Sequence, residues 1–161
     1  MLHNQFYARR FRTKCTGLNS YLGMALFRKL SNKAKTPVKG STFSAGYDLF
    51  APEDTFINAN SRKIVPTDIA MSIPQNHFGL IAARSSRAVN SVDTGGGIID
   101  SDFCGNIGVI LVNNNPSPLF IKQGEKLAQL LLIPIYQGTL TEVDVLPPTE
   151  RGDKGWGSTG K

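Results

Sequence analysis

Apolar residues in this chain occur in short runs separated by glycine, proline, asparagine and aspartate. Valine, isoleucine, leucine and phenylalanine dominate these runs, a composition and length typical of β-strands. No run keeps a helical period for three turns, because the best candidate, 127–132, is followed by Pro134, which cannot continue a helix. The pattern therefore predicts strands at 24–30, 47–51, 63–73, 77–83, 96–100, 107–113, 119–122, 127–135 and 140–146.

These strands, with one short helix expected after Arg84, predict an all-β domain of the sandwich or barrel type. The chain has 161 residues, 40% of them apolar, which is enough to bury a core without disulfide or metal staples. The longest apolar run, 127–136, is far shorter than the about 18 residues that a spanning helix needs. We therefore expect a single soluble domain.

The formal net charge is +6, and its distribution is uneven. Residues 1–47 hold nine basic side chains and no acidic one, so the rest of the chain is slightly acidic. We interpret 1–23 as a basic extension, either disordered or a targeting segment for mitochondria, 24–148 as the domain, and 149–161 as a glycine-rich tail. Because the basicity belongs to one end, no stable nucleic-acid or membrane partner is expected. We expect an intracellular protein, in the cytoplasm or nucleus.

The tail RGDKGWGSTG (151–160) contains four glycines, one arginine and two hydroxyl side chains. Glycines let backbone N–H groups approach an anion closely, and Arg151 can donate two parallel hydrogen bonds to a phosphate. We interpret the segment as a flexible tail that grips phosphate; a terminus without function is the alternative. Its match to G-x-G-x-x-G is weak, because no helix follows.

The segment 94–106 places three glycines before a short apolar run and two carboxylates, Asp100 and Asp102, after it. We expect a β-hairpin that returns into 107–113, with both carboxylates at its rim. Such a pair can orient water, bind a metal or cap a turn. Taken alone, the turn is favoured.

Three further polar features stand out. Arg84, Ser85 and Ser86 follow a predicted strand, where hydroxyl and backbone N–H groups can form an anion site or simply begin a helix. Asp48 and Gln129 each lie within an apolar run, where a polar side chain meets either a ligand or a neighbouring backbone group. Each feature by itself favours the structural explanation.

Together these features change the interpretation. The motifs, in chain order, are AGYDLFA (45–51), ARSS (83–86), GGGIIDSDFCGNIGVILVN (95–113), GEKLAQLLL (124–132) and RGDKGWGSTG (151–160). Residues 24–161 resemble, through these five motifs, the trimeric deoxyuridine triphosphatases, also called dUTP pyrophosphatases. The resemblance implies a jelly-roll, β-clip homotrimer with sites shared between subunits. It also implies Mg²⁺-dependent hydrolysis of dUTP to dUMP and pyrophosphate, which limits uracil in DNA and supplies dUMP.

The resemblance also implies roles for residues. Asp100 would be the base that orients the attacking water, and Asp48 would hold Mg²⁺ through water. The remaining substrate-binding positions divide by the part of dUTP that they would contact. They are Arg84, Ser85, Ser86, Gln129 and Arg151 for the triphosphate, Gly97, Gly108 and Trp156 for uracil, Phe103 for deoxyribose, and Gly157 and Ser158 in the closing tail.

Several positions depart from the family pattern. Phe103 replaces a tyrosine, and Trp156 replaces a phenylalanine. Cys104 replaces a residue that is commonly basic or an amide, and Arg87 replaces an aliphatic one. These departures support one alternative, a catalytically impaired relative that acts as a binding or regulatory module. A dCTP deaminase of the same fold and a small basic nucleic-acid binder are weaker alternatives, because the tail follows the pyrophosphatase pattern and the aromatic residues do not interleave with the basic ones.

Overall fold

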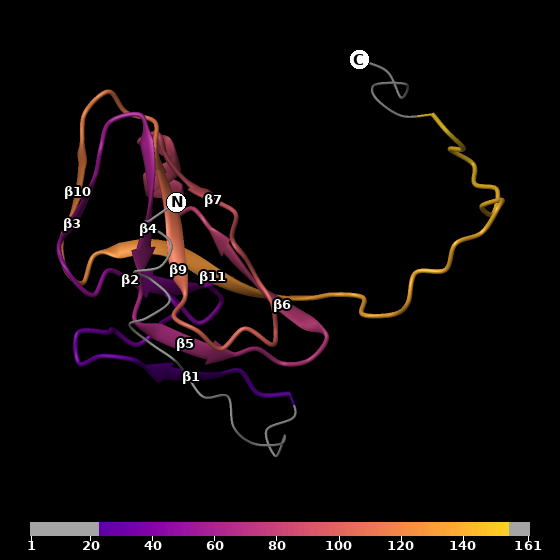
Figure 1. Ribbon diagram of the computed structural model, residues 1–161, viewed down its shortest axis with the longest axis horizontal. Coiled ribbons are helices and arrows are strands. Elements are labelled where there is room, and N and C mark those ends of the chain that lie inside the picture. The colour runs from indigo at the N-terminus through magenta and orange to yellow at the C-terminus, as the bar shows by residue number, and fades with distance from the viewer. Residues whose placement is uncertain (1–22, 155–161) are drawn as a thin grey trace, which may run out of the picture.

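The computed structural model describes residues 23–154, and within them strands account for nearly all regular structure (Figure 1). One short helix, α2 (Ser85–Val89), follows β6, as predicted. The strands are β1 (Leu26–Lys29), β2 (Tyr47–Phe50), β3 (Thr55–Ile57), β4 (Ser61–Pro66), β5 (Ile69–Ser72), β6 (His77–Ala82), β7 (Val92–Gly95), β8 (Ile98–Ile99), β9 (Gly108–Asn113), β10 (Leu119–Ile121) and β11 (Lys126–Pro134). The prediction of an all-β protein with one short helix is confirmed.

Between residues 23 and 154 the strands pair entirely antiparallel and form four sheets. The two larger sheets have the orders β2-β11-β6-β8 and β4-β9-β7, and the pairs β1-β5 and β10-β3 complete the fold. Strand β11 is central to the first sheet and contains a bulge between Lys126 and Ala128. Residues 127–132, the best candidate for a helical period, therefore lie in a strand that has a paired strand on each side.

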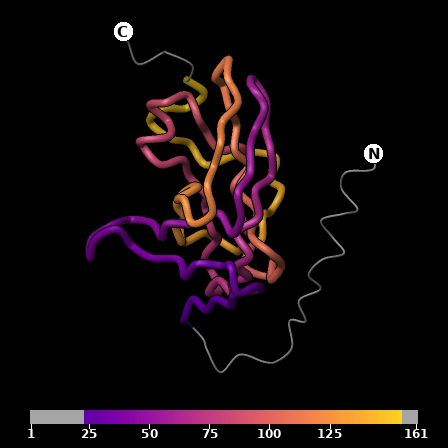
Figure 2. Tube along the Cα trace, turned by 90° about the vertical axis from the view of Figure 1, so that its left-hand side faces the viewer, coloured from indigo at the N-terminus to yellow at the C-terminus, as the bar shows by residue number. Residues whose placement is uncertain are grey.

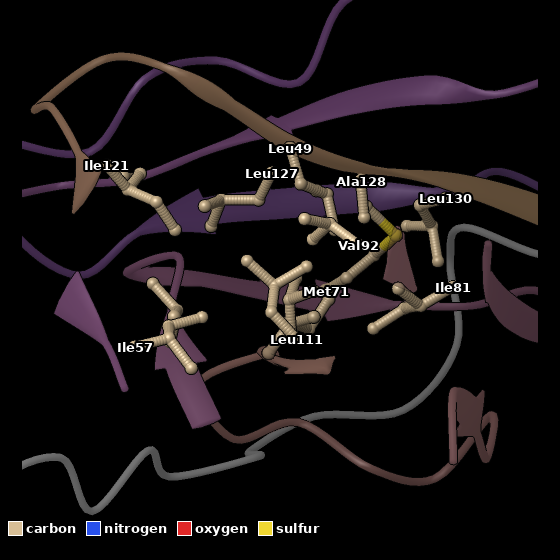
Figure 3. Close-up of a cluster of buried hydrophobic side chains, with 14 of the residues drawn as sticks. Leu49, Ile57, Met71, Ile81, Val92, Leu111, Ile121, Leu127, Ala128 and Leu130 are labelled. Atoms are coloured by element: carbon tan, nitrogen blue, oxygen red, sulfur yellow. The ribbon is translucent and has the colours of Figure 1, made fainter. Parts of the chain in front are cut away.

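One hydrophobic core joins the sheets (Figure 3). Side chains from β2, β11 and β6, which belong to one sheet, pack against those from β5, β7 and β9. Ile57 on β3 and Ile121 on β10 lie at one end of the core. The members labelled in the figure are Leu49, Ile57, Met71, Ile81, Val92, Leu111, Ile121, Leu127, Ala128 and Leu130. Their burial supplies the main driving force for folding, since each large apolar side chain contributes about 1.5–3 kcal/mol.

A fully buried amide, Asn113, fixes the turn that connects β9 to β10. Its Nδ2 donates to the carbonyl oxygens of Ile57, Asn58 and Ser117, and its Oδ1 accepts from Asn115. Every polar atom of this side chain is thus satisfied, which offsets the cost of burying it.

Three predictions about strands are wrong. The run 63–73 forms two strands, β4 and β5, which belong to different sheets and are separated by Thr67 and Asp68. The run 96–100 does not form a hairpin with 107–113, because β8 pairs with β6 while β9 pairs with β4 and β7. The run 140–146 alternates like a strand but forms none, and its side chains are exposed. An alternating pattern shows only which face would be apolar, whereas a strand also needs a partner edge.

Two segments project from the body. The chain after β11 runs away from the sheets as far as its last described residue (Figure 1), and the segment between β1 and β2 extends as a long loop (Figure 2). In 23–154, no helix has the length and apolar character needed to cross a membrane. The predicted basic extension, except its last residue, lies outside the described residues.

Candidate functional site

One buried carboxylate, Asp48, is held between two cations. Its Oδ1 lies 3.2 Å from Nε of Arg84, and its Oδ2 lies 2.6 Å from Nζ of Lys126. Asp48 is on β2, Arg84 immediately precedes α2, and Lys126 begins β11. Three segments distant in the sequence therefore converge on a single carboxylate.

The strand register explains this convergence. Gln129 on β11 lies opposite Asp48 on β2 and opposite Ala82 on β6. Its Nε2 donates to the carbonyl oxygen of Ala83 at 3.3 Å, and the chain continues from there directly into Arg84. The sheet thus places the polar side chains of Asp48 and Gln129 beside Arg84, in the connection between β6 and α2.

We call Asp48, Arg84 and Lys126 the Asp48 cluster. It carries a net positive charge, because it contains two cations and one carboxylate. Both cationic side chains are about one third exposed, so an incoming ligand can reach them. Partly exposed cations close together are a typical site for phosphate groups. The sequence predicted Asp48, Arg84 and Gln129 here, but missed Lys126, whose only signal was a basic residue at the start of an apolar strand.

The side chains around Asp48 limit how Mg²⁺ could be held. Among the residues that the structure describes, no group of three or more His, Cys, Asp or Glu side chains could enclose a metal. A carboxylate has about four acceptor sites, and the two ion pairs leave some of them for water. Asp48 would therefore fit Mg²⁺ only through water molecules that the ion keeps.

A groove of about 940 Å³ extends from this cluster along α2. Its lining includes Arg84, Ser86 and Lys126, and also Asn113 with the turn that follows it. Arg84 Nη1 approaches Ser86 Oγ at 3.5 Å, and Ser85 is exposed on the same helix. The hydroxyl groups predicted to bind phosphate thus lie beside the cationic cluster.

Arg87, a departure from the family pattern, is buried and lines the groove. Its Nη2 lies 2.7 Å from Oε1 of Glu125 and also donates to the carbonyl oxygen of Lys126 at 2.9 Å. Its Nε donates to the same carbonyl at 3.1 Å. Nothing in the sequence signalled this pairing.

Gly97 and Gly108, the glycines predicted to contact uracil, each have a neighbouring residue very close to their own backbone. Gly97 has φ +99°, and its carbonyl oxygen accepts a hydrogen bond from Ile81 N at 2.8 Å. A Cβ at Gly97 would lie 2.7 Å from the carbonyl oxygen of Ile81. A Cβ at Gly108 would lie equally close to the Ile64 side chain. Both positions therefore need glycine for steric reasons.

Asp100 and Phe103 lie in a turn after β8. Asp100 is exposed, and its carbonyl oxygen accepts a hydrogen bond from Phe103 N at 3.1 Å. The Phe103 ring covers Gly105 and is 42% exposed. Within residues 23–154, no ion pair or hydrogen bond joins Asp100 or Phe103 to the Asp48 cluster.

The predicted tail residues divide between described and undescribed parts of the chain. Arg151 is exposed in a short turn where Gly152 N donates to the carbonyl oxygen of Thr149. Trp156, Gly157 and Ser158 lie outside the described residues. The structure thus brings together the residues of the first, second and fourth motifs.

Comparison with known proteins gives a consistent result. The family model named dUTPase matches residues 32–160. Deoxyuridine 5'-triphosphate nucleotidohydrolases of rabbitpox virus and variola virus are each 46% identical over 134 residues, which span 83% of this chain and 91% of the viral protein.

Solved structures show the same relationship. The dUTPase of Staphylococcus bacteriophage 80alpha with dUpNHpp superposes with a TM-score of 0.82 at 27% identity, covering 86% of this chain and 99% of that one. A mutant dUTPase from phage phi11 of S. aureus, described with a structural Mg(II) ion, gives a TM-score of 0.71 at 27% identity, covering 76% and 97%.

Proposed function

The chain belongs to the dUTPase family, and we propose that it hydrolyses dUTP to dUMP and pyrophosphate by attack of water on the α-phosphorus. This proposal rests on the Asp48 cluster, because its two accessible cations line a groove together with the hydroxyl group of Ser86. Removal of dUTP would limit uracil in DNA, and the dUMP formed would be available for nucleotide synthesis.

The triphosphate would bind at the Asp48 cluster. Arg84 and Lys126 would balance its charge, and Ser85, Ser86 and Gln129 would donate hydrogen bonds to it. Phosphoryl transfer needs mainly positioning and neutralisation of charge, which these groups supply. Solved dUTPases bound to dUpNHpp support a nucleotide of this type as the ligand.

Mg²⁺ would accompany the triphosphate and neutralise charge that develops on its oxygens. Asp48 would orient the water shell of the ion while it keeps Arg84 and Lys126 in place. The phage phi11 relative, described with a structural Mg(II) ion, supports a role for this metal in the family.

Asp100 would hold the attacking water and accept its proton. Asp100 directly follows the paired strand β8, and its carbonyl oxygen accepts a hydrogen bond from Phe103 N, so its backbone position is defined, which suits this role. Gly97 and Gly108 would let backbone groups reach the edge of uracil, and the Phe103 ring would pack against deoxyribose where a ribose hydroxyl would collide.

The active assembly would be a homotrimer in which different subunits supply different parts of each site. Asp100 and Phe103 share no polar contact with the Asp48 cluster among the described residues, and the exposed segment after β11 carries Arg151 away from its own body (Figure 1). Both observations support sites completed by a neighbouring subunit. Arg151 would then reach the γ-phosphate, and Trp156, with Gly157 and Ser158, would close over uracil.

The reaction is tested by release of pyrophosphate from dUTP, with dTTP and dCTP as competing substrates. We expect release from dUTP alone, and loss of release in Asp100→Asn. Asp102→Asn is the matched control, since Asp102 is also exposed and lies two residues further along. Full activity in Asp100→Asn would refute the role of the base. Binding of dUTP without hydrolysis by the unaltered protein would favour the regulatory alternative.

Shared sites are tested by mixing two inactive variants, Asp100→Asn and Arg84→Ala, under conditions that exchange subunits. If one subunit supplies Asp100 and another supplies Arg84, some sites in mixed trimers contain both native residues and activity returns. No recovery in demonstrably mixed trimers would show that both residues act within one chain.

A further inference from the structure

Arg87 forms a compact set of contacts that the proposed reaction does not use. Its side chain is 10% exposed, and its guanidinium binds both the Glu125 carboxylate and the main-chain oxygen of Lys126. Glu125 is itself fixed, since its Oε2 accepts a hydrogen bond from Lys122 N at 3.0 Å. The Arg87 end of the ion pair is buried, whereas the Glu125 end is 43% exposed and is anchored by this backbone donor.

Burial makes this geometry demanding. Removing a charge from water costs several kcal/mol unless the charge is paired and its donors are satisfied. Arg87 is paired, and two of its three nitrogens are bonded: Nε donates to the Lys126 carbonyl oxygen, and Nη2 donates to that oxygen and to the Glu125 carboxylate. An arginine can make these bonds simultaneously because its donors form a rigid fork, whereas a lysine cannot.

The contacts of Arg87 connect the two halves of the Asp48 cluster. Arg84 lies one turn earlier on the same helical segment and pairs with Oδ1 of Asp48. Lys126, whose carbonyl Arg87 binds, pairs with Oδ2 of the same carboxylate. Helix α2 has only five residues, too few to be stable without tertiary contacts. The hydrogen bonds of the Arg87 guanidinium thus link α2, which follows Arg84, to β11, which begins with Lys126.

We propose that Arg87 is a positioning residue for the triphosphate, fixing α2 on β11 so that Arg84 and Lys126 are held at the separation that the phosphate groups require. This inference rests on the proposed function and adds to it a residue that does not touch the substrate. Loss of Arg87 should weaken binding of the phosphate groups, because Arg87 contacts no residue that we assign to uracil or deoxyribose.

The test compares Arg87→Leu with the unaltered protein. We expect the dissociation constant of a non-hydrolysable dUTP analogue, and KM for dUTP, to rise about tenfold, equivalent to about 1.4 kcal/mol. Binding of dUMP, which lacks the outer phosphates, should change by less than about twofold. Lys33→Leu is the control, because Lys33 forms an exposed 3.9 Å ion pair with Glu53 away from the groove. It should change neither constant.

Arg87→Lys is the second variant, which keeps the charge but not the fork. We expect it to weaken binding of the dUTP analogue without affecting dUMP, and it decides the matter if Arg87→Leu does not fold. Unchanged binding of the analogue in a folded variant, or an equal loss for the analogue and dUMP, would overturn the proposal. Failure of the unaltered protein to hydrolyse dUTP would instead refute the proposed function, and binding of the analogue is measured without hydrolysis.

Discussion

Gln129 lies directly opposite Asp48 in the antiparallel pairing of β11 with β2. A polar residue within an apolar strand thus faces the carboxylate that organises the cationic cluster, while its amide donates to the carbonyl oxygen of Ala83. The two explanations considered for this glutamine, a structural contact and a ligand contact, are therefore compatible. The hydrogen bond to the Ala83 carbonyl oxygen holds the Gln129 side chain at the position where we propose that the triphosphate binds.

Gln129→Leu should raise KM for dUTP about tenfold, because a hydrogen bond to a charged group is worth about 1.5–3 kcal/mol. The substitution keeps the side-chain volume but removes the amide, which also leaves the Ala83 carbonyl without its donor. Steady-state kinetics measure the effect, with the exposed Gln123→Leu as control. Equal KM values for both variants would exclude Gln129 from the binding site.

Phe103→Ala should weaken discrimination against the ribose sugar. Loss of the ring opens the space in which a 2′-hydroxyl would collide, so the ratio of kcat/KM for dUTP to that for UTP should fall about tenfold or more. Phe120→Ala is the matched control, since Phe120 is 73% exposed on β10. A ratio that does not change in Phe103→Ala would show that sugar selection depends on other groups.

Gly97→Ala should destabilise the fold by about 1–3 kcal/mol, because alanine is strained at a positive φ. The added methyl group would also lie 2.7 Å from the carbonyl oxygen of Ile81. The midpoint of urea unfolding measures this loss. Gly40→Ala is the control, since its Cβ would meet Ser44 Oγ at an ordinary 3.5 Å. Identical midpoints for the two variants would contradict the steric argument.

Trp156 is the single tryptophan of the chain, so its fluorescence reports directly on the tail. Addition of Mg²⁺ and a non-hydrolysable dUTP analogue should change the emission, because the indole would leave water and stack on uracil. The corresponding dTTP analogue should have no effect. An unchanged spectrum with bound dUTP analogue would rule out stacking by Trp156.

The sequence predicted most strands because each short apolar run ends at turn-forming residues. It could not predict which strands pair when a strand is very short. The two residues of β8 contain no information on register, and their pairing with β6 is accompanied by the bond from Ile81 N to the Gly97 carbonyl. The mistaken hairpin came from treating neighbours in sequence as neighbours in the sheet.

The candidate site shows the same division. The motif resemblance indicated Asp48, Arg84 and Gln129, which the structure brings together. Lys126 and Arg87 were missed as parts of the cluster because their partners are set by tertiary structure. The Arg87 side chain meets a carbonyl 39 residues away, and a basic residue in a short helix gives no indication of such a partner.

The segment after Gln137 makes hydrogen bonds only within itself among the described residues, whereas the last strand, β11, ends at Pro134. In a single subunit, a protease has access to this backbone without opening any sheet. One cut there would remove Arg151 and Trp156 and leave the strands intact. Proteolysis would therefore inactivate the enzyme without unfolding it. Protection of this segment from cleavage would indicate that it has docked on a neighbouring subunit.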